Sequence, residues 1–169
     1  ARGRIPTAWA ETGEGLPTRI TVMTWREAEH TRIALKRGHM VVSAQHRSGY
    51  LDYAQTSAAC EPPAQPGAVV DLRTVHGHEP PDDRDTSGRL LGMQAHLWTE
   101  FVPTAEHVDY LAFPRLCALA DRAWHGEPSW PDFRGRLTAH AARLAVLGVR
   151  HGPLDPYVPV PHRSGKELP

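Results

Sequence analysis

Short hydrophobic runs alternate with segments of helical periodicity along most of the chain. Four of these runs are rich in β-branched or other apolar residues, which is typical of β-strands. We expect these strands at residues 5–9, 20–25, 40–43 and 90–98. Strand-like runs that alternate with helix-like segments predict an α/β fold built from parallel βα units.

Longer segments carry apolar residues at helical spacing. Residues 27–37 predict a helix that ends before Gly38, which occupies the usual position of a glycine just past a helix end. Residues 103–124 predict a long helix, and Pro114 inside it should introduce a kink, because proline lacks the N–H that a helix needs. The region between the third and fourth strands differs from these segments, because it shows little periodicity.

A last helix is expected to begin at Ser129, with Asp132 as its capping partner, and to end at Gly148. Its apolar face would consist of Phe133, Leu137, Ala141, Leu144 and Leu147. Residues 53–88 form a long irregular stretch, rich in Pro, Asp and His, with a short helix expected at 69–75. Residues 1–150 are therefore expected to form one domain, followed by a proline-rich C-terminal tail at 151–169.

Composition excludes several classes of partner. The 169 residues include 19 Lys and Arg against 19 Asp and Glu, so nothing indicates a surface for nucleic acid or for a membrane. No apolar run approaches the roughly 20 residues that cross a bilayer. The two cysteines, Cys60 and Cys117, lie far apart in the sequence, and we expect two unpaired thiols, with a disulfide as the alternative.

Aromatic and acidic residues stand at or just beyond the predicted carboxyl ends of all four strands. In chain order they are Trp9, Trp25, Tyr50, Asp52, Trp98 and Glu100. Residues two apart on a strand face the same side, so Trp98 and Glu100 should project together. Ligands of parallel α/β sheets bind at the carboxyl ends of the strands. An indole face beside a carboxylate suits a sugar ring, which can stack on the indole while its hydroxyls donate to the carboxylate.

Each of these residues also has a purely structural interpretation. A tryptophan at a strand end often packs in the core, and Tyr50 could be a buried ring whose hydroxyl bonds to the backbone. Asp52 could stabilise a turn, and Glu100 could stabilise the N-terminus of the following helix. Their coincidence at four successive strand ends favours a shared, aromatic-walled pocket over four separate structural roles.

A second candidate site lies within the irregular stretch. His76 and His78 are followed by acidic residues as far as Asp85. A His-x-His pair with acidic neighbours can bind zinc or another divalent cation, which would indicate a metal-dependent hydrolase. A solvated acidic loop explains the segment as well, because Pro80 and Pro81 interrupt any helix. The acidic loop is the simpler interpretation, so we expect no metal and no other cofactor.

Several sequence elements, taken together and in order, resemble a known family. They are Trp9, Met23-Thr24-Trp25, Gly49-Tyr50-Leu51-Asp52-Tyr53, Gly92-Met93-Gln94-Ala95-His96-Leu97-Trp98-Thr99-Glu100 and Phe113-Pro114-Arg115-Leu116. Over residues 3–150 the chain resembles the C-terminal half of the catalytic domain of glycoside hydrolase family 20, the β-N-acetylhexosaminidases. The resemblance implies a (β/α)8 TIM barrel, of which the four strands would be strands five to eight.

The resemblance also implies a reaction. Family members remove terminal N-acetylglucosamine or N-acetylgalactosamine from β-glycosides with retention, and the acetamido oxygen of the substrate is the nucleophile. Tyr50 would be the catalytic residue that donates its hydroxyl to this oxygen. The three tryptophans would enclose the acetamido methyl group, with Trp98 also stacking beneath the sugar. Glu100 would accept from the 3- and 4-hydroxyls, and Asp52 from the 4- or 6-hydroxyl.

One expected part of the site is missing from the sequence. The family uses an Asp-Glu pair at the end of strand four, and no Asp-Glu dipeptide occurs in these residues. The chain is therefore expected to be inactive alone and to need the missing N-terminal half of the barrel as its partner. Without that half, both outer strands would have an unpaired edge, and interior side chains such as Val22 and Val41 would be half covered. The alternative is a non-catalytic carbohydrate-binding remnant of the same fold.

Overall fold

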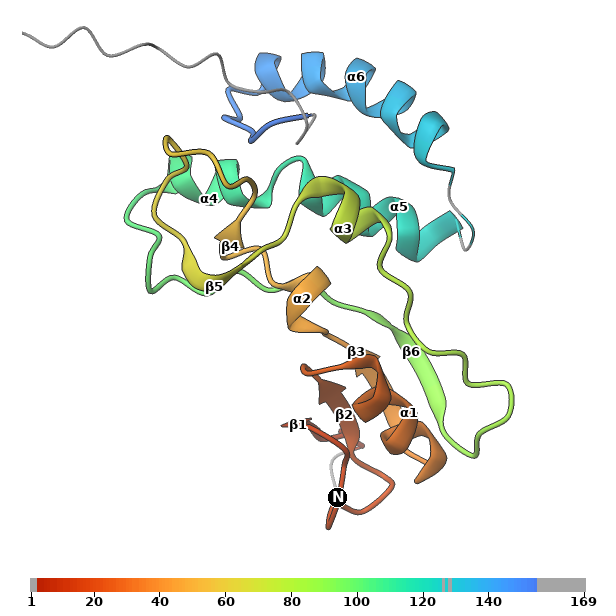
Figure 1. Cartoon of the computed structure of the whole chain (residues 1–169). Coiled ribbons are helices and arrows are strands. Elements are labelled where there is room, and N and C mark those ends of the chain that lie inside the picture. Colours follow the sequence, from red (N-terminus) through yellow and green to blue (C-terminus); the bar gives the residue numbers. More distant parts are fainter. Residues whose placement is uncertain (1–2, 126, 128, 155–169) are drawn as a thin grey trace, which may run out of the picture.

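The computed structural model describes residues 3–125, 127 and 129–154. In this part of the chain, the larger sheet has four parallel strands in the order β1-β2-β3-β6 (Figure 1). They are β1 (Thr7–Ala10), β2 (Thr21–Thr24), β3 (Met40–Ser43) and β6 (Arg89–Met93). The predicted α/β fold with parallel strands in chain order is confirmed, although every strand but β3 differs in its bounds from the predicted run.

Helix α1 (Ala28–Lys36) packs against one face of this sheet. Val22 and Val41 lie opposite each other on β2 and β3, and both are fully buried in a cluster with Ala34 and Leu35 of α1. The prediction that Val22 and Val41 would be half covered is therefore wrong. Both faces of a parallel sheet carry apolar residues, and these two valines belong to the face under the helix.

The opposite face of the sheet is less covered. Trp9, Met23 and Val42 are register partners across β1, β2 and β3, and each of them keeps part of its surface exposed. Leu91 of β6 is 51% exposed. In the described part of the chain, β1 and β6 each pair with another strand on one side only. This sheet therefore presents an apolar face and two unpaired edges.

The connection between β3 and β6 is more ordered than the sequence predicts. It contains α2 (His46–Gly49), the short parallel pair of β4 (Tyr53–Ala54) and β5 (Gln65–Val69), and α3 (Leu72–His76). The prediction of an irregular stretch over 53–88 is wrong for its first half. The expected short helix exists, but it begins after Asp71, whose carboxylate accepts a 2.7 Å hydrogen bond from the Thr74 N–H.

In the described residues, three helices follow the sheet, namely α4 (Ala105–Ala112), α5 (Arg115–His125) and α6 (Trp130–Val146). The long helix predicted over 103–124 is divided into α4 and α5 at Pro114, so the proline breaks the helix and does not merely kink it. Phe113 has an extended backbone, with ψ at 141°, because the ring of a following proline disfavours the helical conformation. This break places Arg115 in the first turn of α5.

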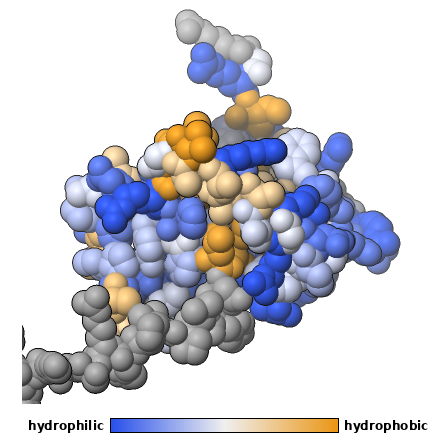
Figure 2. Space-filling view, turned by 90° about the horizontal axis from the view of Figure 1, so that it is seen from above, coloured by the Kyte–Doolittle hydropathy of each residue, from blue (hydrophilic) through white to orange (hydrophobic). Residues whose placement is uncertain are grey.

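Helix α6 begins as predicted, since the Ser129 hydroxyl accepts from the Asp132 N–H at 3.5 Å. Phe133 and Leu137 are buried in a core with residues of α3 and α5. Leu147 was expected on the same apolar face, but it lies beyond α6 and is 74% exposed. Figure 2 looks onto the molecule from the α6 side and shows hydrophobic residues in the middle of the view, with hydrophilic residues to the left and right.

Two remaining sequence expectations concern the cysteines and the tail. Cys60 and Cys117 are both free thiols, as expected. No helix in the described residues is long and apolar enough to cross a membrane. Of the tail predicted at 151–169, residues 155–169 lie outside the described part of the chain.

Candidate active site

A hollow of about 490 Å³ opens at the carboxyl ends of the sheet strands. It is lined by Trp9, Trp25, His46, Tyr50, Asp52, Tyr53, Gln65, Trp98 and Glu100. All six residues that the sequence singles out at the strand ends are among them. The structure thus brings together residues that lie up to 91 positions apart, from Trp9 to Glu100. The volume is within the range of pockets that hold small molecules.

The route by which Trp98 and Glu100 reach the hollow differs from the prediction. Strand β6 ends at Met93, so neither residue stands on a strand. Instead, the chain after β6 runs beside the Tyr50 segment, where Tyr50 and His96 form an isolated parallel bridge. The two backbone bonds of this bridge are His96 N–H to Gly49 O at 2.8 Å and Leu51 N–H to His96 O at 2.6 Å.

The aromatic side chains form a continuous wall. Trp9 and Trp98 have ring centroids 6.1 Å apart, and Trp98 and Tyr50 are 6.3 Å apart. His46 continues the wall, at 6.2 Å from Tyr50 and 6.2 Å from Trp25. Because adjacent rings are tilted and not coplanar, they enclose a concave surface. Such a surface suits a flat, largely apolar face of a ligand.

His96 supports this wall from behind. Its ring stacks on Trp98 at 6.0 Å with an interplanar angle of 15°, and it lies 4.7 Å from Trp9 and 5.2 Å from Tyr50. Burial lowers the pKa of His96, so the imidazole is neutral at neutral pH. A neutral ring can pack between the three aromatic side chains without the cost of a buried charge.

Asp52 is the buried acceptor of the hollow. Its side chain is 4% exposed, and Oδ1 has no hydrogen-bond partner among the described residues. Burial raises its pKa, and the negative charge of Glu100 acts in the same direction, whereas backbone N–H groups and Arg115 act in the opposite direction. A buried acceptor without a partner is unfavourable, so this oxygen is ready to accept a hydrogen bond from a ligand.

Tyr50 supplies a hydrogen-bond donor near Asp52. Burial raises the pKa of its phenol, and the nearby Asp52 and Tyr53 add to this effect, while a hydrogen bond with the Trp98 side chain opposes it. The hydroxyl therefore stays protonated at neutral pH. The hollow thus combines an O–H donor, a buried carboxylate and an exposed one, Glu100, within one aromatic wall.

Three lining residues, namely His46, Tyr53 and Gln65, were not predicted from the sequence. His46 begins α2 shortly after β3 ends, so the rule that ligands meet strand ends could have found it. Gln65 could not be found in this way, because it starts β5 in the stretch that was expected to be irregular. Its N–H donates to the Asp52 carbonyl at 2.8 Å, which brings β5 to the hollow.

His76 and His78, the candidate metal ligands, each contact a different side chain of the fold. His76 Nε2 lies 3.2 Å from Asp121 Oδ2, and its ring stacks on Phe133. His78 instead hydrogen-bonds to the Ser48 hydroxyl, and burial lowers its pKa to about 4. Within the described ranges, no group of three or more His, Cys, Asp or Glu side chains could hold a metal ion. The two histidines therefore form no shared ligand set.

A parallel α/β sheet with a ligand-sized hollow at its strand ends is the arrangement of barrel enzymes, and the comparisons identify the family. The model of the glycosyl hydrolase family 20 catalytic domain matches residues 1–127. A β-hexosaminidase of Porphyromonas gingivalis is 33% identical over 170 residues, which cover 96% of this chain and 21% of that protein. The chain belongs to glycosyl hydrolase family 20.

Solved structures agree with this family. The GH20 exo-β-N-acetylglucosaminidase of Vibrio harveyi, in complex with N-acetylglucosamine, superposes with a TM-score of 0.82 at 28% identity, over 90% of this chain and 25% of that chain. A β-N-acetylhexosaminidase of Bacteroides fragilis gives 0.71 at 26% identity, over 90% and 32%. The chain thus has an α/β fold that superposes on part of family 20 TIM-barrel enzymes, and it spans about a fifth of the Porphyromonas gingivalis relative's length.

Proposed function

We propose that this chain is the substrate-binding, C-terminal half of a β-N-acetylhexosaminidase barrel, which contributes strands five to eight. The observation that carries this proposal is the hollow at the strand ends, where three tryptophans, two tyrosines and two carboxylates meet. The four strands run parallel in chain order and, within the described residues, leave two unpaired edges, as half of a barrel would. The relatives named β-hexosaminidase support the choice of an amino sugar.

In the proposed complex, Trp9, Trp25 and Trp98 enclose the acetamido methyl group of the sugar. The protonated Tyr50 hydroxyl donates to the acetamido oxygen and restrains it in its attacking position. Asp52 and Glu100 accept from sugar hydroxyls. The proton donor and the aspartate that orients the acetamido group come from the other half of the barrel, because this sequence contains no Asp-Glu pair. The non-catalytic carbohydrate-binding alternative uses the same hollow and has no observation of its own in its favour.

Binding of N-acetylglucosamine to the full chain tests this proposal. The sugar is expected to change the tryptophan fluorescence, because three indoles line the hollow. Glucose, which lacks the acetamido group, should bind roughly tenfold more weakly, because it buries no methyl group and makes no bond to Tyr50. Equal affinity for glucose and N-acetylglucosamine, or no fluorescence response to either sugar, would contradict an amino-sugar site.

The raised pKa of Asp52 predicts how this binding depends on pH. A carboxylate only accepts hydrogen bonds, as a sugar hydroxyl donor requires. The protonated acid also has an O–H that needs an acceptor of its own, so protonation weakens binding. The pKa of Asp52 lies above that of an ordinary aspartate. As the pH is lowered, affinity for N-acetylglucosamine should therefore begin to fall at a higher pH than an ordinary aspartate would give. A fluorescence titration repeated at several pH values measures this. A loss that begins only at the pH of an ordinary, exposed aspartate would disagree with the buried position of Asp52.

A further inference from the structure

Arg115 has an unusual set of partners at the start of α5. Its side chain is completely buried, and its guanidinium donates to four backbone carbonyls. The carbonyl of Leu51 accepts at 2.5 Å, that of Val70 at 2.7 Å and that of Tyr53 at 2.9 Å. The Leu111 carbonyl accepts from two nitrogens, at 2.7 and 3.0 Å. A rigid fork of N–H donors is needed to hold so many carbonyls at once.

These carbonyls belong to the segments that build the hollow. Leu51 and Tyr53 are the two neighbours of Asp52, so Arg115 binds the backbone on both sides of that residue. Val70 directly follows β5, the strand that starts at the pocket residue Gln65. One side chain from outside the hollow therefore joins the segment that carries Asp52 to the strand beside it.

The charge of Arg115 is not neutralised at close range. In the part of the chain that the structure describes, all of its side-chain hydrogen bonds go to backbone carbonyls and none to a carboxylate. Burial lowers the pKa of Arg115 to about 10, while Glu61, Tyr110, Asp52 and Asp71 raise it from a distance. A buried cation is costly, and a structural clamp alone does not explain why a charged group stands beside Asp52.

We propose that Arg115 is a positioning residue of the hollow, which fixes the backbone on both sides of Asp52 and presents a buried positive charge to its carboxylate. Among the described residues, Arg115 and Glu100 are the charged groups that act on that carboxylate, Tyr50 is a titratable neighbour, and Arg115 is the positive group. Burial and repulsion by Glu100 both raise the pKa of Asp52, and the positive charge of Arg115 opposes this rise. The identity of the ligand rests on the proposed function, whereas the positioning role does not.

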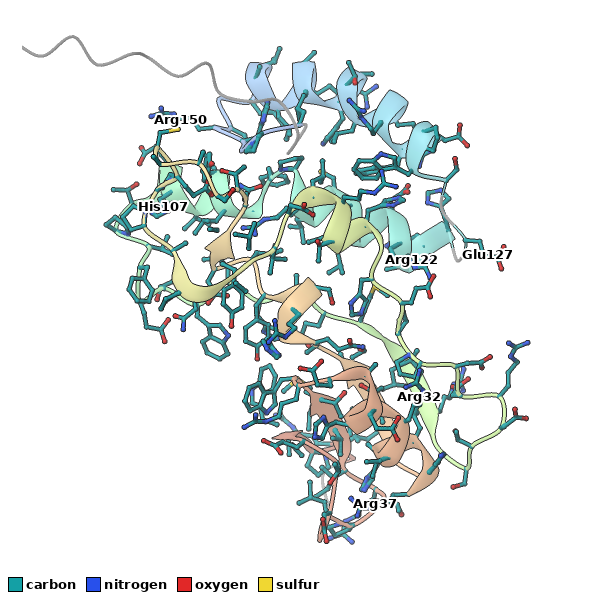
Figure 3. All side chains as sticks on the ribbon, viewed as in Figure 1. Arg32, Arg37, His107, Arg122, Glu127 and Arg150 are labelled. Carbon is teal, nitrogen blue, oxygen red and sulfur yellow. The ribbon has the colours of Figure 1, made fainter. Side chains whose placement is uncertain are left out.

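Three variants of the full chain separate the two parts of this role. Arg115→Lys keeps the charge and loses the fork, and Arg115→Gln loses both. Arg122→Gln is the matched control, because Arg122 also lies on α5 (Figure 3) and pairs with the exposed Glu79 at 3.3 Å. Hydrogen exchange of the Gln65 N–H, which donates to the Asp52 carbonyl, should be about tenfold faster or more in both Arg115 variants. It should stay unchanged in the control.

The pKa of Asp52, measured by NMR of its carboxyl carbon without any sugar, provides the second measurement. It is expected to rise in Arg115→Gln and to remain close to the wild-type value in Arg115→Lys, a difference that a purely structural arginine would not produce. An unchanged Asp52 pKa in folded Arg115→Gln overturns the proposal. If that variant does not fold, Arg115→Lys decides, because unchanged exchange at Gln65 in it also overturns the proposal and faster exchange with a retained Asp52 pKa supports it.

Neither measurement uses a ligand. A wild-type chain that fails to bind N-acetylglucosamine would therefore count against the proposed function and leave the positioning role of Arg115 standing. Conversely, a chain that binds the sugar normally but shows no effect of Arg115 on Asp52 would overturn the positioning role alone.

Discussion

Joining the preceding half of a family 20 barrel to this chain is expected to raise its hydrolysis of a nitrophenyl N-acetylglucosaminide by about 10²- to 10⁴-fold, the usual contribution of general acid catalysis. The Porphyromonas gingivalis relative is a suitable donor of that half, since it is 33% identical to this chain. Under the proposed function, the chain alone binds the sugar, but its sequence lacks the Asp-Glu pair that would protonate the leaving oxygen. The measurement is release of nitrophenol by the fusion, compared with the chain alone and the donor half alone.

Two controls make this result specific. The same fusion with the glutamate of the donor's Asp-Glu pair replaced by glutamine should lose most of the gain, because an amide cannot donate the proton. The fusion with Tyr50→Phe should also be slower, since the phenol no longer restrains the acetamido oxygen. Robust turnover by the unfused chain would contradict the proposal, because it would require a proton donor within these residues.

The same proposal explains the exposed features of the sheet. Leu91 and Trp9 lie on the face away from α1 and are 51% and 41% exposed, and the outer strands β1 and β6 are each unpaired on one side in the described part of the chain. In a closed barrel this face is filled and no edge remains. A preceding half-barrel would therefore cover the apolar face and complete the site at once.

The order and direction of the strands could be predicted from sequence because each strand is a short apolar run between polar connections. The C-terminal end of β6 could not be predicted in this way. The apolar run continues to Trp98, but the strand stops at Met93 once its partner β3 ends at Ser43. Strand length is set by the partner and not by the hydrophobicity of the run alone. Trp98 and Glu100 do line the same hollow, as the sequence predicts, but neither of them lies on a strand.

The sequence also could not predict which face of each strand packs against a helix. Side chains alternate between the two faces of a strand, so Val22 and Val41 could each be placed on one face of its strand. In a parallel sheet both faces are apolar, so this alternation does not tell which face packs against a helix. The structure places both valines under Leu35 of α1. Gln65 was missed for a related reason, since β5 is held by pairing with β4 and not by an apolar run of its own.

Replacing Asp52 with asparagine is expected to weaken binding of N-acetylglucosamine by about tenfold to a hundredfold, because a hydrogen bond to a charged acceptor contributes about 1.5–3 kcal/mol. The substitution keeps the shape of the side chain and removes its charge. A fluorescence titration of the variant measures the loss. Asp82→Asn is the matched control, since Asp82 lies outside the hollow and pairs with the exposed Arg84, and its affinity for the sugar should be unchanged.

The same variant should also be more stable, which distinguishes a ligand-binding carboxylate from a structural one. Because the pKa of Asp52 is higher in the folded chain than its ordinary value, folding disfavours its charged form at neutral pH, and the neutral amide escapes this cost. The gain in the free energy of unfolding should be largest at neutral pH. It should shrink as the pH falls through the folded-state pKa, where the wild-type carboxyl takes up its proton. Urea denaturation at neutral and acidic pH measures this difference. A structural carboxylate would give the opposite sign, so a less stable Asp52→Asn chain at neutral pH would show that Asp52 serves the fold and not the sugar.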